Sequence, residues 1–367
     1  MVRARASTSA KLTADEPPAP PVQRPFDGGI DALPWLAAPL AQALRTQRGH
    51  ALLVHADAGV GALAFALAFA QGQLCEAEGA ANGRPCGRCG SCHLAGAGTH
   101  PDLLLRLPED VAVEHQLAAP PSDKRKPSRQ IRVEEMRAAM TWMTTTSGRG
   151  QGKVLVIHPA EAMNLVSASA LLKTLEEPPS GARLVLTASD PSHLLPTVVS
   201  RCQRLGLPTP PRETALQWLQ QHGVPEPGVL LDGAGGRPLE ALRWHRQGVS
   251  AADWAALPRD LAAGDLQRLS AWPVARWLDA LHKLCHDASV RACGGAARFY
   301  PEVSFEGVGR LSALIAWQRS LQRVARHADH PWNEPLLLEA LCAEGREALR
   351  AKVASRADRA VATLSAR

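Results

Sequence analysis

Four cysteines gathered in one short stretch are the residues best suited to bind a metal. Cys86, Cys89 and Cys92 are separated by two residues each, and Cys75 precedes them after ten intervening residues. Four thiolates satisfy the tetrahedral preference of structural zinc sites, and the glycines between them permit the tight turns that this spacing requires. We therefore predict a structural zinc site, with no coordination position left open for catalysis, whose ligands are Cys75, Cys86, Cys89 and Cys92.

The cysteine cluster has other interpretations. Its members could be reduced thiols in a loop, or one Cys-x-x-Cys pair could do redox chemistry, although that motif belongs to a thioredoxin-like βαβ unit. His93 could replace one thiolate as a ligand. The other four cysteines are scattered, and no apolar stretch follows the basic N-terminus as it would in a secretory signal. These features favour a metal site over a disulfide framework and predict a cytoplasmic protein.

A second segment has the placement of a nucleotide-binding loop without its chemistry. A phosphate-binding loop reads G-x-x-x-x-G-K-[ST] after a strand, where the lysine contacts phosphate and the hydroxyl holds Mg²⁺. After the apolar run 51–55, the lysine and the hydroxyl are replaced by apolar side chains, and Asp57 would face the anionic phosphate. We expect no ATP to bind here, and a plain turn would explain the segment equally well. The residues of this degenerate loop are Ala56, Gly59, Gly61, Ala62 and Leu63.

The strand that would carry the acidic residues of an NTPase lacks them. An active enzyme of this type ends that strand with acidic residues that hold Mg²⁺ and orient the attacking water. Here the strand ends in His158 and Pro159, and we do not assign Glu161, two residues further on, as a general base. The isolated chain is therefore expected not to hydrolyse ATP. A divergent ATPase that uses substitute residues is the alternative.

Apolar runs alternate with helical patterns through the first two hundred residues. This alternation is typical of a parallel α/β sheet, and the continuous apolar character of 153–158 is typical of a strand buried on both faces. The predicted strands are 51–55, 102–107, 153–158, 183–188 and 203–207, and the predicted helices are 63–74, 132–145 and 164–177. Only helical patterns follow Pro211.

Length and composition suggest how the 367 residues are divided. The chain is 46% hydrophobic, which is enough for two or three cores. Residues 1–30 are rich in alanine, proline and charge, so we predict a disordered tail. We expect an α/β domain at 31–208 with a zinc-binding insertion at 75–92, a small helical lid domain at 209–250, and a helical C-terminal domain at 251–367.

The charge balance favours no class of partner. The 41 basic and 35 acidic residues leave a net charge of +6, and no apolar run approaches the roughly 18 residues that span a bilayer. The basic loop 124–129 could touch DNA phosphate, although a solvated loop is the simpler explanation. A zinc-containing DNA-binding module is a further alternative, against which the weak charge and the lack of basic–aromatic clusters count.

Four segments resemble one protein family. Ala170-Leu-Leu-Lys-Thr-Leu-Glu-Glu-Pro-Pro179 resembles the ALLKTLEEPP stretch of the bacterial DNA polymerase III clamp-loader subunits, a family with an AAA+-type fold. Residues 186–191 and 196–202 resemble the family's sensor strand and its Ser-Arg-Cys motif, and 98–102 resembles the delta-prime branch. The resemblance is firm from about 35 to 210, weaker to 250, and compositional beyond.

The departures from the family pattern point to its delta-prime branch. The gamma and tau subunits keep the Lys-Thr and Asp-Glu pairs that this chain lacks, and Leu239 stands at the place of their sensor arginine, with Arg237 two positions early. The resemblance implies an AAA+-type sheet with flanking helices, a lid, and an all-α C-terminal collar. It also implies a hetero-oligomer with delta and gamma/tau that acts on the sliding clamp and, through the complex, on primed DNA.

The resemblance assigns one functional residue. Arg201 of the Ser-Arg-Cys motif would act in trans as an arginine finger that reaches the ATP of a neighbouring subunit, positioned by Ser200 and Cys202. A surface salt bridge at a helix end is the structural alternative for Arg201. Lys173 and Glu177, four residues apart on one predicted helix, are interpreted as an exposed ion pair or a subunit contact, without a catalytic role.

Overall fold

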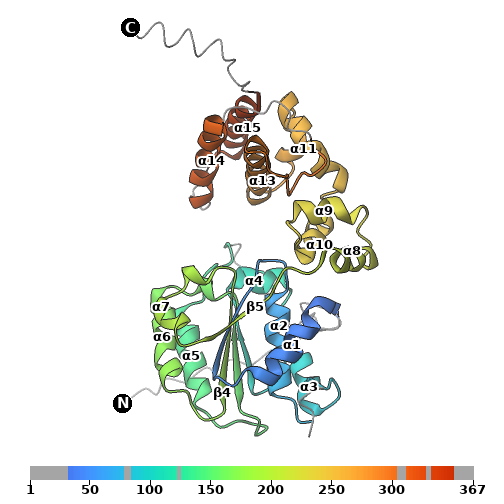
Figure 1. Cartoon of the computed structure of the whole chain (residues 1–367). Helices are drawn as coiled ribbons and strands as arrows, with labels where there is room; N and C mark the ends of the chain where they lie inside the picture. The colour runs from blue at the N-terminus through green and yellow to red at the C-terminus, as the bar shows by residue number, and fades with distance from the viewer. Residues whose placement is uncertain (1–31, 78–83, 122–124, 304–310, 328–331, 351–367) are drawn as a thin grey trace, which may run out of the picture.

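A computed structural model describes residues 32–77, 84–121, 125–303, 311–327 and 332–350 (Figure 1). The predicted tail at 1–30 lies outside these residues. A five-stranded sheet, in which every pair of neighbours is parallel, has the order β2-β3-β4-β1-β5. Its strands are β1 (Ala51–His55), β2 (Leu103–Arg106), β3 (Lys153–Ile157), β4 (Ala182–Ala188) and β5 (Gln203–Gly206).

Helices cover both faces of the sheet. Figure 1 shows α5, α6 and α7 on one face and α1 and α2 on the other. The bounds are α1 (Pro34–Thr46), α2 (Ala62–Gln73), α5 (Val133–Met143), α6 (Leu165–Glu176) and α7 (Pro196–Val199). Four short elements join them, namely α3 (Gly90–Gly96), α4 (Glu109–Glu114), η2 (Ala160–Ala162) and η3 (Pro191–His193).

The alternation of side chains along the strands produces two cores. Leu53 and Leu155 pack in one buried cluster with Leu171 of α6. Their neighbours Val54 and Val156 belong to a second cluster on the opposite face, together with side chains of α2. Since successive residues of a strand point to opposite faces, a segment buried on both faces must be apolar, as 52–54 of β1 and 184–186 of β4 are. Both strands have a neighbour on each side in the sheet.

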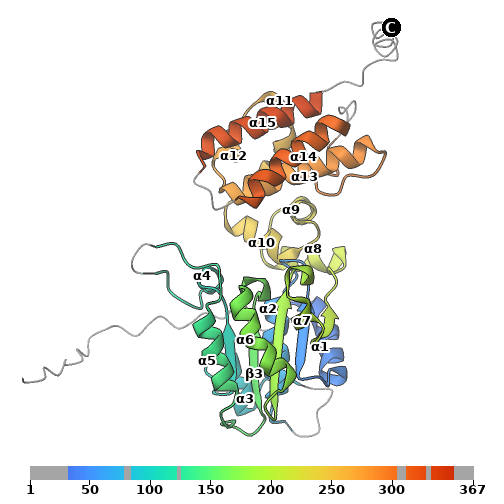
Figure 2. The ribbon, with the colours of Figure 1, turned by 90° about the vertical axis from the view of Figure 1, so that its left-hand side faces the viewer.

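The rest of the described chain is helical. It contains α8 (Arg212–Gln221), α9 (Pro227–Gly233), α10 (Pro238–Arg246), α11 (Ala251–Ala263), α12 (Gln267–Ser270), α13 (Val274–Ala292), α14 (Leu311–Arg326) and α15 (Glu334–Arg350). In Figures 1 and 2, α8–α10 lie between the sheet and the bundle of α11–α15. The expected boundary at 250 falls between α10 and α11, although one hydrophobic cluster includes Trp244 of α10 and Trp254 of α11. The division into lid and collar therefore stays a proposal.

The predicted α/β architecture followed by helices is confirmed, with additions. The predicted strands and helices are all present with ends that differ by at most two residues, and the α/β part also contains the unpredicted helices α1, α3, α4 and α7. The predicted loop after α4 is partly held to this helix, because Arg125 forms an ion pair with Glu109 at 2.6 Å. None of the helices in the described ranges is both long and apolar enough to cross a membrane.

Candidate metal centre and arginine site

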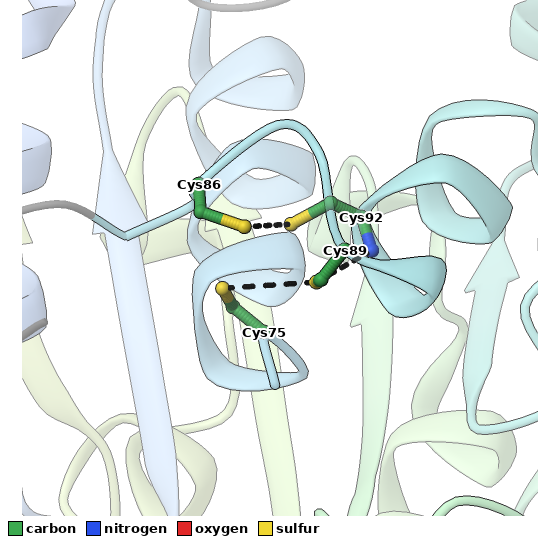
Figure 3. A group of neighbouring side chains, drawn as sticks. All are labelled: Cys75, Cys86, Cys89 and Cys92. Carbon is green, nitrogen blue, oxygen red and sulfur yellow. Dashed lines mark hydrogen bonds between the residues drawn. The ribbon is translucent and has the colours of Figure 1, made fainter. Parts of the chain in front are cut away.

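The four clustered cysteines converge on one point. Cys75 follows α2, Cys86 and Cys89 lie in the next connection, and Cys92 lies in α3 (Figure 3). All four sulfurs lie within 4.8 Å of one another, with 3.9 Å between Cys86 and Cys92 and 4.0 Å between Cys89 and Cys75. Tetrahedral zinc with Zn–S bonds of about 2.3 Å sets its sulfurs about 3.8 Å apart. The donor set and its spacing therefore fit a tetrahedral metal ion.

The environment of the sulfurs favours a bound cation. Backbone N–H groups of Arg88 and Cys89 lower the pKa of Cys86 to about 6, so this thiol ionises readily. Burial has the opposite effect on Cys92, whose pKa it raises. A cation bound among the sulfurs would supply the positive charge that keeps the buried Cys92 ionised, because metal coordination deprotonates a thiol.

A polar network joins the cysteine cluster to the sheet. Glu76, next to Cys75, accepts hydrogen bonds from Arg149 Nε at 2.7 Å and from Ser91 Oγ at 3.1 Å. Ser91 lies between two of the cysteines, and its Oγ is 3.0 Å from Nε2 of His100. The residues of the network that the sequence analysis did not single out are Glu76, Ser91 and Arg149. The position of Glu76 beside Cys75 was the available signal.

The network continues through His100 to Asp102. His100 Nδ1 accepts the backbone N–H of Asp102 at 3.0 Å, so Nε2 carries the proton and the ring is neutral. Burial lowers the pKa of His100, which agrees with this state. The carboxylate of Asp102 accepts from the backbone N–H groups of Gly148 and Arg149 at 2.7 and 2.9 Å. The segment 98–102 thus links the cysteine cluster to the loop before β3.

The degenerate phosphate loop is closed by its own neighbours. A Cβ at Gly61 would lie 3.0 Å from Leu36 and 3.1 Å from Leu33, at the start of α1. A Cβ at Gly59 would lie 2.8 Å from the Cβ of Glu240 in α10. The φ angles are positive at both positions, 91° at Gly59 and 113° at Gly61, which explains the glycines without any bound phosphate. Apolar side chains therefore pack where the backbone of a working loop would approach a ligand.

The carbonyl groups of this loop hold neighbouring elements. Three of them accept hydrogen bonds, from Trp35 Nε1 at 2.8 Å, from Arg237 Nη1 at 3.2 Å and from the backbone N–H of Leu239 at 3.2 Å. Arg237, near the place of the missing sensor arginine, is thus used to join α10 to the loop.

The end of β3 carries a neutral imidazole. His158 Nδ1 lies 2.6 Å from Thr187 Oγ1, and burial, with a smaller contribution from His115, lowers the pKa of His158 to about 3. Glu161 accepts the backbone N–H groups of Ser189 and Asp190 at 2.5 and 2.9 Å. Its carboxylate therefore caps the end of β4.

Arg201 lies exposed just after α7. Its Nη1 donates to the carbonyl of Thr197 at 3.0 Å and its Nη2 to Glu176 Oε1 at 2.6 Å, while 35% of its side chain remains exposed. Ser200 Oγ donates to the same carbonyl at 3.2 Å. Burial raises the pKa of the adjacent Cys202 to about 11, which makes it a packed thiol and not a nucleophile.

Of the two interpretations of Lys173 and Glu177, the exposed ion pair does not form within the described chain, and the subunit contact stays a prediction. Glu177 is the C-cap of α6 and has left helical geometry, with φ −126° and ψ 73°. Glu176 pairs with Arg201 instead, and no ion pair of Lys173 or Glu177 occurs within the part of the chain that the structure describes.

The sheet and its degenerate loop define a class of protein. A five-stranded parallel sheet with helices on both faces, a loop at the β1–α2 connection and a helical second half form an AAA+-type architecture. Among solved structures, a DNA polymerase III gamma-subunit-related protein of Thermotoga maritima aligns with 86% of this chain at 17% identity and a TM-score of 0.40.

Sequence comparisons identify the family within this class. Residues 36–211 match the family described as DNA polymerase III, delta subunit. The chain is 39% identical over 224 residues to DNA polymerase III subunit delta' of Pseudomonas aeruginosa, covering 60% of this chain and 63% of the relative. It is 33% identical over 266 residues to subunit delta' of Yersinia pestis, covering 68% and 72%. The chain therefore belongs to the DNA polymerase III subunit delta' family.

These alignments leave part of the relatives unmatched. The chain spans 63% of the length of the Pseudomonas aeruginosa protein and 62% of that of subunit delta' of Haemophilus influenzae, with which it shares 34% identity over 222 residues. Similarity extends at 29% identity to subunit tau of Escherichia coli, of which 30% is covered.

Proposed function

We propose that this chain is a non-catalytic subunit of the DNA polymerase III clamp loader. In the cytoplasm it would assemble with delta and gamma/tau subunits to load the sliding clamp onto primed DNA. Within that assembly it would supply Arg201 to the ATP site of the neighbouring subunit. Its family membership supports the assembly, and the exposed, oriented guanidinium of Arg201 is the observation that carries the functional assignment.

The state of the chain's own loop supports a role without hydrolysis. The loop has neither the lysine nor the hydroxyl of a working phosphate loop, and leucines of α1 approach Gly61. A divergent ATPase would need other residues in place of the lysine and the hydroxyl. The leucine side chains beside Gly61 would also have to move before a nucleotide could bind there. This requirement counts against the divergent-ATPase alternative.

The chemistry of Arg201 suits an ATP site shared between two chains. Phosphoryl transfer is accelerated by cationic groups that stabilise the negative charge of the γ-phosphate oxygens, and a guanidinium supplied from a neighbouring protein can raise its rate by roughly 10³-fold or more. Arg201 has five N–H donors, and its contacts with Thr197 and Glu176 use one donor each. Three donors remain for a phosphate.

We propose that the metal bound by Cys75, Cys86, Cys89 and Cys92 is a structural zinc ion. The four thiolates complete a tetrahedron and leave no position for a substrate. Zinc would hold the end of α2, the start of α3 and the connection between them in one arrangement. It takes no part in the ATP chemistry.

ATP hydrolysis by the reconstituted complex tests the role of Arg201. Cognate gamma/tau, delta, clamp and primed DNA would be mixed with the parent chain or with Arg201→Ala. We expect the variant to assemble normally, as judged by gel filtration, and to lose most of the turnover that this chain adds. Arg204→Ala is the matched control, because Arg204 is an exposed arginine on the adjacent strand β5.

Two results would contradict the proposal. Equal turnover with the parent and with Arg201→Ala, in complexes of the same composition, would leave the chain as a scaffold. Failure of the parent to assemble with cognate partners would remove the clamp-loader assignment itself. Tight, salt-sensitive binding of DNA by the chain alone would then favour the DNA-binding module.

A further inference from the structure

We propose that Glu176 is a positioning residue for Arg201, which holds the guanidinium in the orientation that a neighbouring ATP site requires. This inference rests on the proposed function of Arg201. It adds a second residue to that function, with a role that is argued from the geometry around the arginine.

The contact joins two elements that are distant in sequence. Glu176 is the last residue of α6, and Arg201 lies 25 residues further on, after α7. Oε1 of Glu176 accepts from Nη2 at 2.6 Å, and the carbonyl of Thr197 accepts from Nη1 at 3.0 Å. Since the guanidinium is planar, two acceptors on two of its nitrogens determine the direction in which the group faces.

Both contacts are compatible with binding of a phosphate. Each contact occupies one N–H of its nitrogen, which leaves one N–H on Nη1, one on Nη2 and the N–H of Nε. Arg201 therefore does not need to release Glu176 in order to donate to phosphate oxygens. A pre-oriented guanidinium avoids the loss of side-chain freedom when it docks, and misplacement of such a group by about 1 Å can cost about 100-fold in rate.

The pair does little for the stability of the isolated chain. The Glu176 side chain is 53% exposed and that of Arg201 is 35% exposed, and ion pairs this exposed contribute little to folding. Substitution of Glu176 should therefore leave the fold intact. Any kinetic effect in the complex then reports on the orientation of Arg201.

The chain provides a matched control in the next residue. Glu177 is also exposed and carries the same charge, but it forms none of the ion pairs found in the described part of the chain. Glu176→Gln and Glu177→Gln therefore change the net charge equally at adjacent positions. They differ in the loss of the ionic contact to Arg201.

The test is steady-state ATP hydrolysis by the complete clamp-loader complex, with the parent, Glu176→Gln, Glu177→Gln or Arg201→Ala. We expect Glu176→Gln to lower the Arg201-dependent part of kcat by about tenfold, with KM for ATP unchanged within about twofold. Glu177→Gln should behave as the parent. Glu176→Asp keeps the charge and should recover part of the lost kcat.

A double substitution separates positioning from a general structural effect. If Glu176 acts through Arg201, Glu176→Gln should cause no further loss in the Arg201→Ala background. An independent loss in that background would overturn the proposal, as would parent-like or raised turnover of Glu176→Gln alone. Parent-like turnover of Arg201→Ala would instead refute the proposed function on which this inference rests.

Discussion

At the scale of single residues, His158 contributes to the fold at a position where a working NTPase needs acidic side chains. It is held beside Thr187 at the end of β3, and its ring centroid lies 6.4 Å from that of His115. Burial keeps its imidazole uncharged, since ionisation in this environment would carry a large desolvation cost. A neutral ring that packs therefore occupies this position.

This burial makes the stability of the α/β region dependent on pH. The folded pKa of His158 is about 3 and its ordinary value is 6.5, so the unfolded chain binds the proton more tightly between these values. Stability is therefore retained above pH 6.5 and lost as the pH falls toward 3, by about 2 kcal/mol at pH 5. We expect His158→Gln to remove this loss, measured by hydrogen exchange of β3 amides at pH 7.5 and pH 5.

A control separates His158 from the other histidines. His193 is exposed, so His193→Gln should keep the pH dependence of the parent. An equal loss of β3 protection at pH 5 in the parent and in His158→Gln would show that other groups, such as His115, cause it.

Among the elements, α3 and its connection depend most on groups outside themselves. Helix α3 has seven residues and starts at Gly90, and helices this short are not stable alone. Its contacts to the rest of the domain run through Cys92, beside the other three sulfurs, and through Ser91, beside Glu76 and His100. The cysteine cluster and the polar network, with a hydrogen bond from Gln71 of α2 to the carbonyl of Cys92, together hold it against α2.

Removal of the proposed zinc ion should therefore release this element selectively. After chelation, we expect amides of 86–97 to lose nearly all protection from hydrogen exchange and amides of the 147–150 loop to lose part of theirs, while β1 and β4 change little. Structural zinc contributes folding free energy directly, which is the reason for this loss. The measurement is hydrogen exchange followed by mass spectrometry, together with the metal content.

Substitution of cysteines gives the matched comparison. Cys89→Ser should reproduce the effect of chelation, whereas Cys293→Ser, at an exposed cysteine outside the cluster, should not. Unchanged exchange of 86–97 after confirmed loss of the metal would contradict the assignment.

At the scale of the whole molecule, the closed loop forms part of the junction between the sheet and the helices. Carbonyls of the loop accept from α10, and Arg243 of α10 forms an ion pair with Glu114 of α4 at 2.8 Å. Further along, Lys283 of α13 lies 4.5 Å from the ring of Trp244 in α10. A segment with the placement of a phosphate-binding loop is here a contact between helical and sheet regions.

Gly59 tests this junction. Its φ is 91°, and an added Cβ would lie 2.8 Å from Glu240 Cβ and 3.1 Å from the backbone N of Glu240. We expect Gly59→Ala to destabilise the junction by about 2 kcal/mol and to increase proteolysis of the connection at 207–211. Gly223→Ala is the control, because Gly223 also has positive φ but a Cβ added there would have no atom within 4 Å. Equal proteolysis of the two variants would indicate backbone strain alone.

The sequence by itself determined the elements and the candidate ligands. The spacing of apolar residues located the strands and helices, because an element with one buried face or two has a characteristic local pattern of apolar residues. Cysteine spacing predicted the metal ligands because a turn of the backbone brings close residues onto one ion. The segments 170–179 and 196–202 identified the family.

Only the tertiary structure decided which distant groups meet. The pairing of Glu176 with Arg201, the contact of Glu76 with Arg149 73 residues away, and the closure of the loop by α1 and α10 depend on how the elements are stacked. The expected ion pair of Lys173 with Glu177 does not form, because α6 ends before Glu177. The acidic residue beside it, Glu176, pairs instead with Arg201, which a different element supplies. Local sequence encodes periodicity, whereas contacts between elements are fixed by topology and packing.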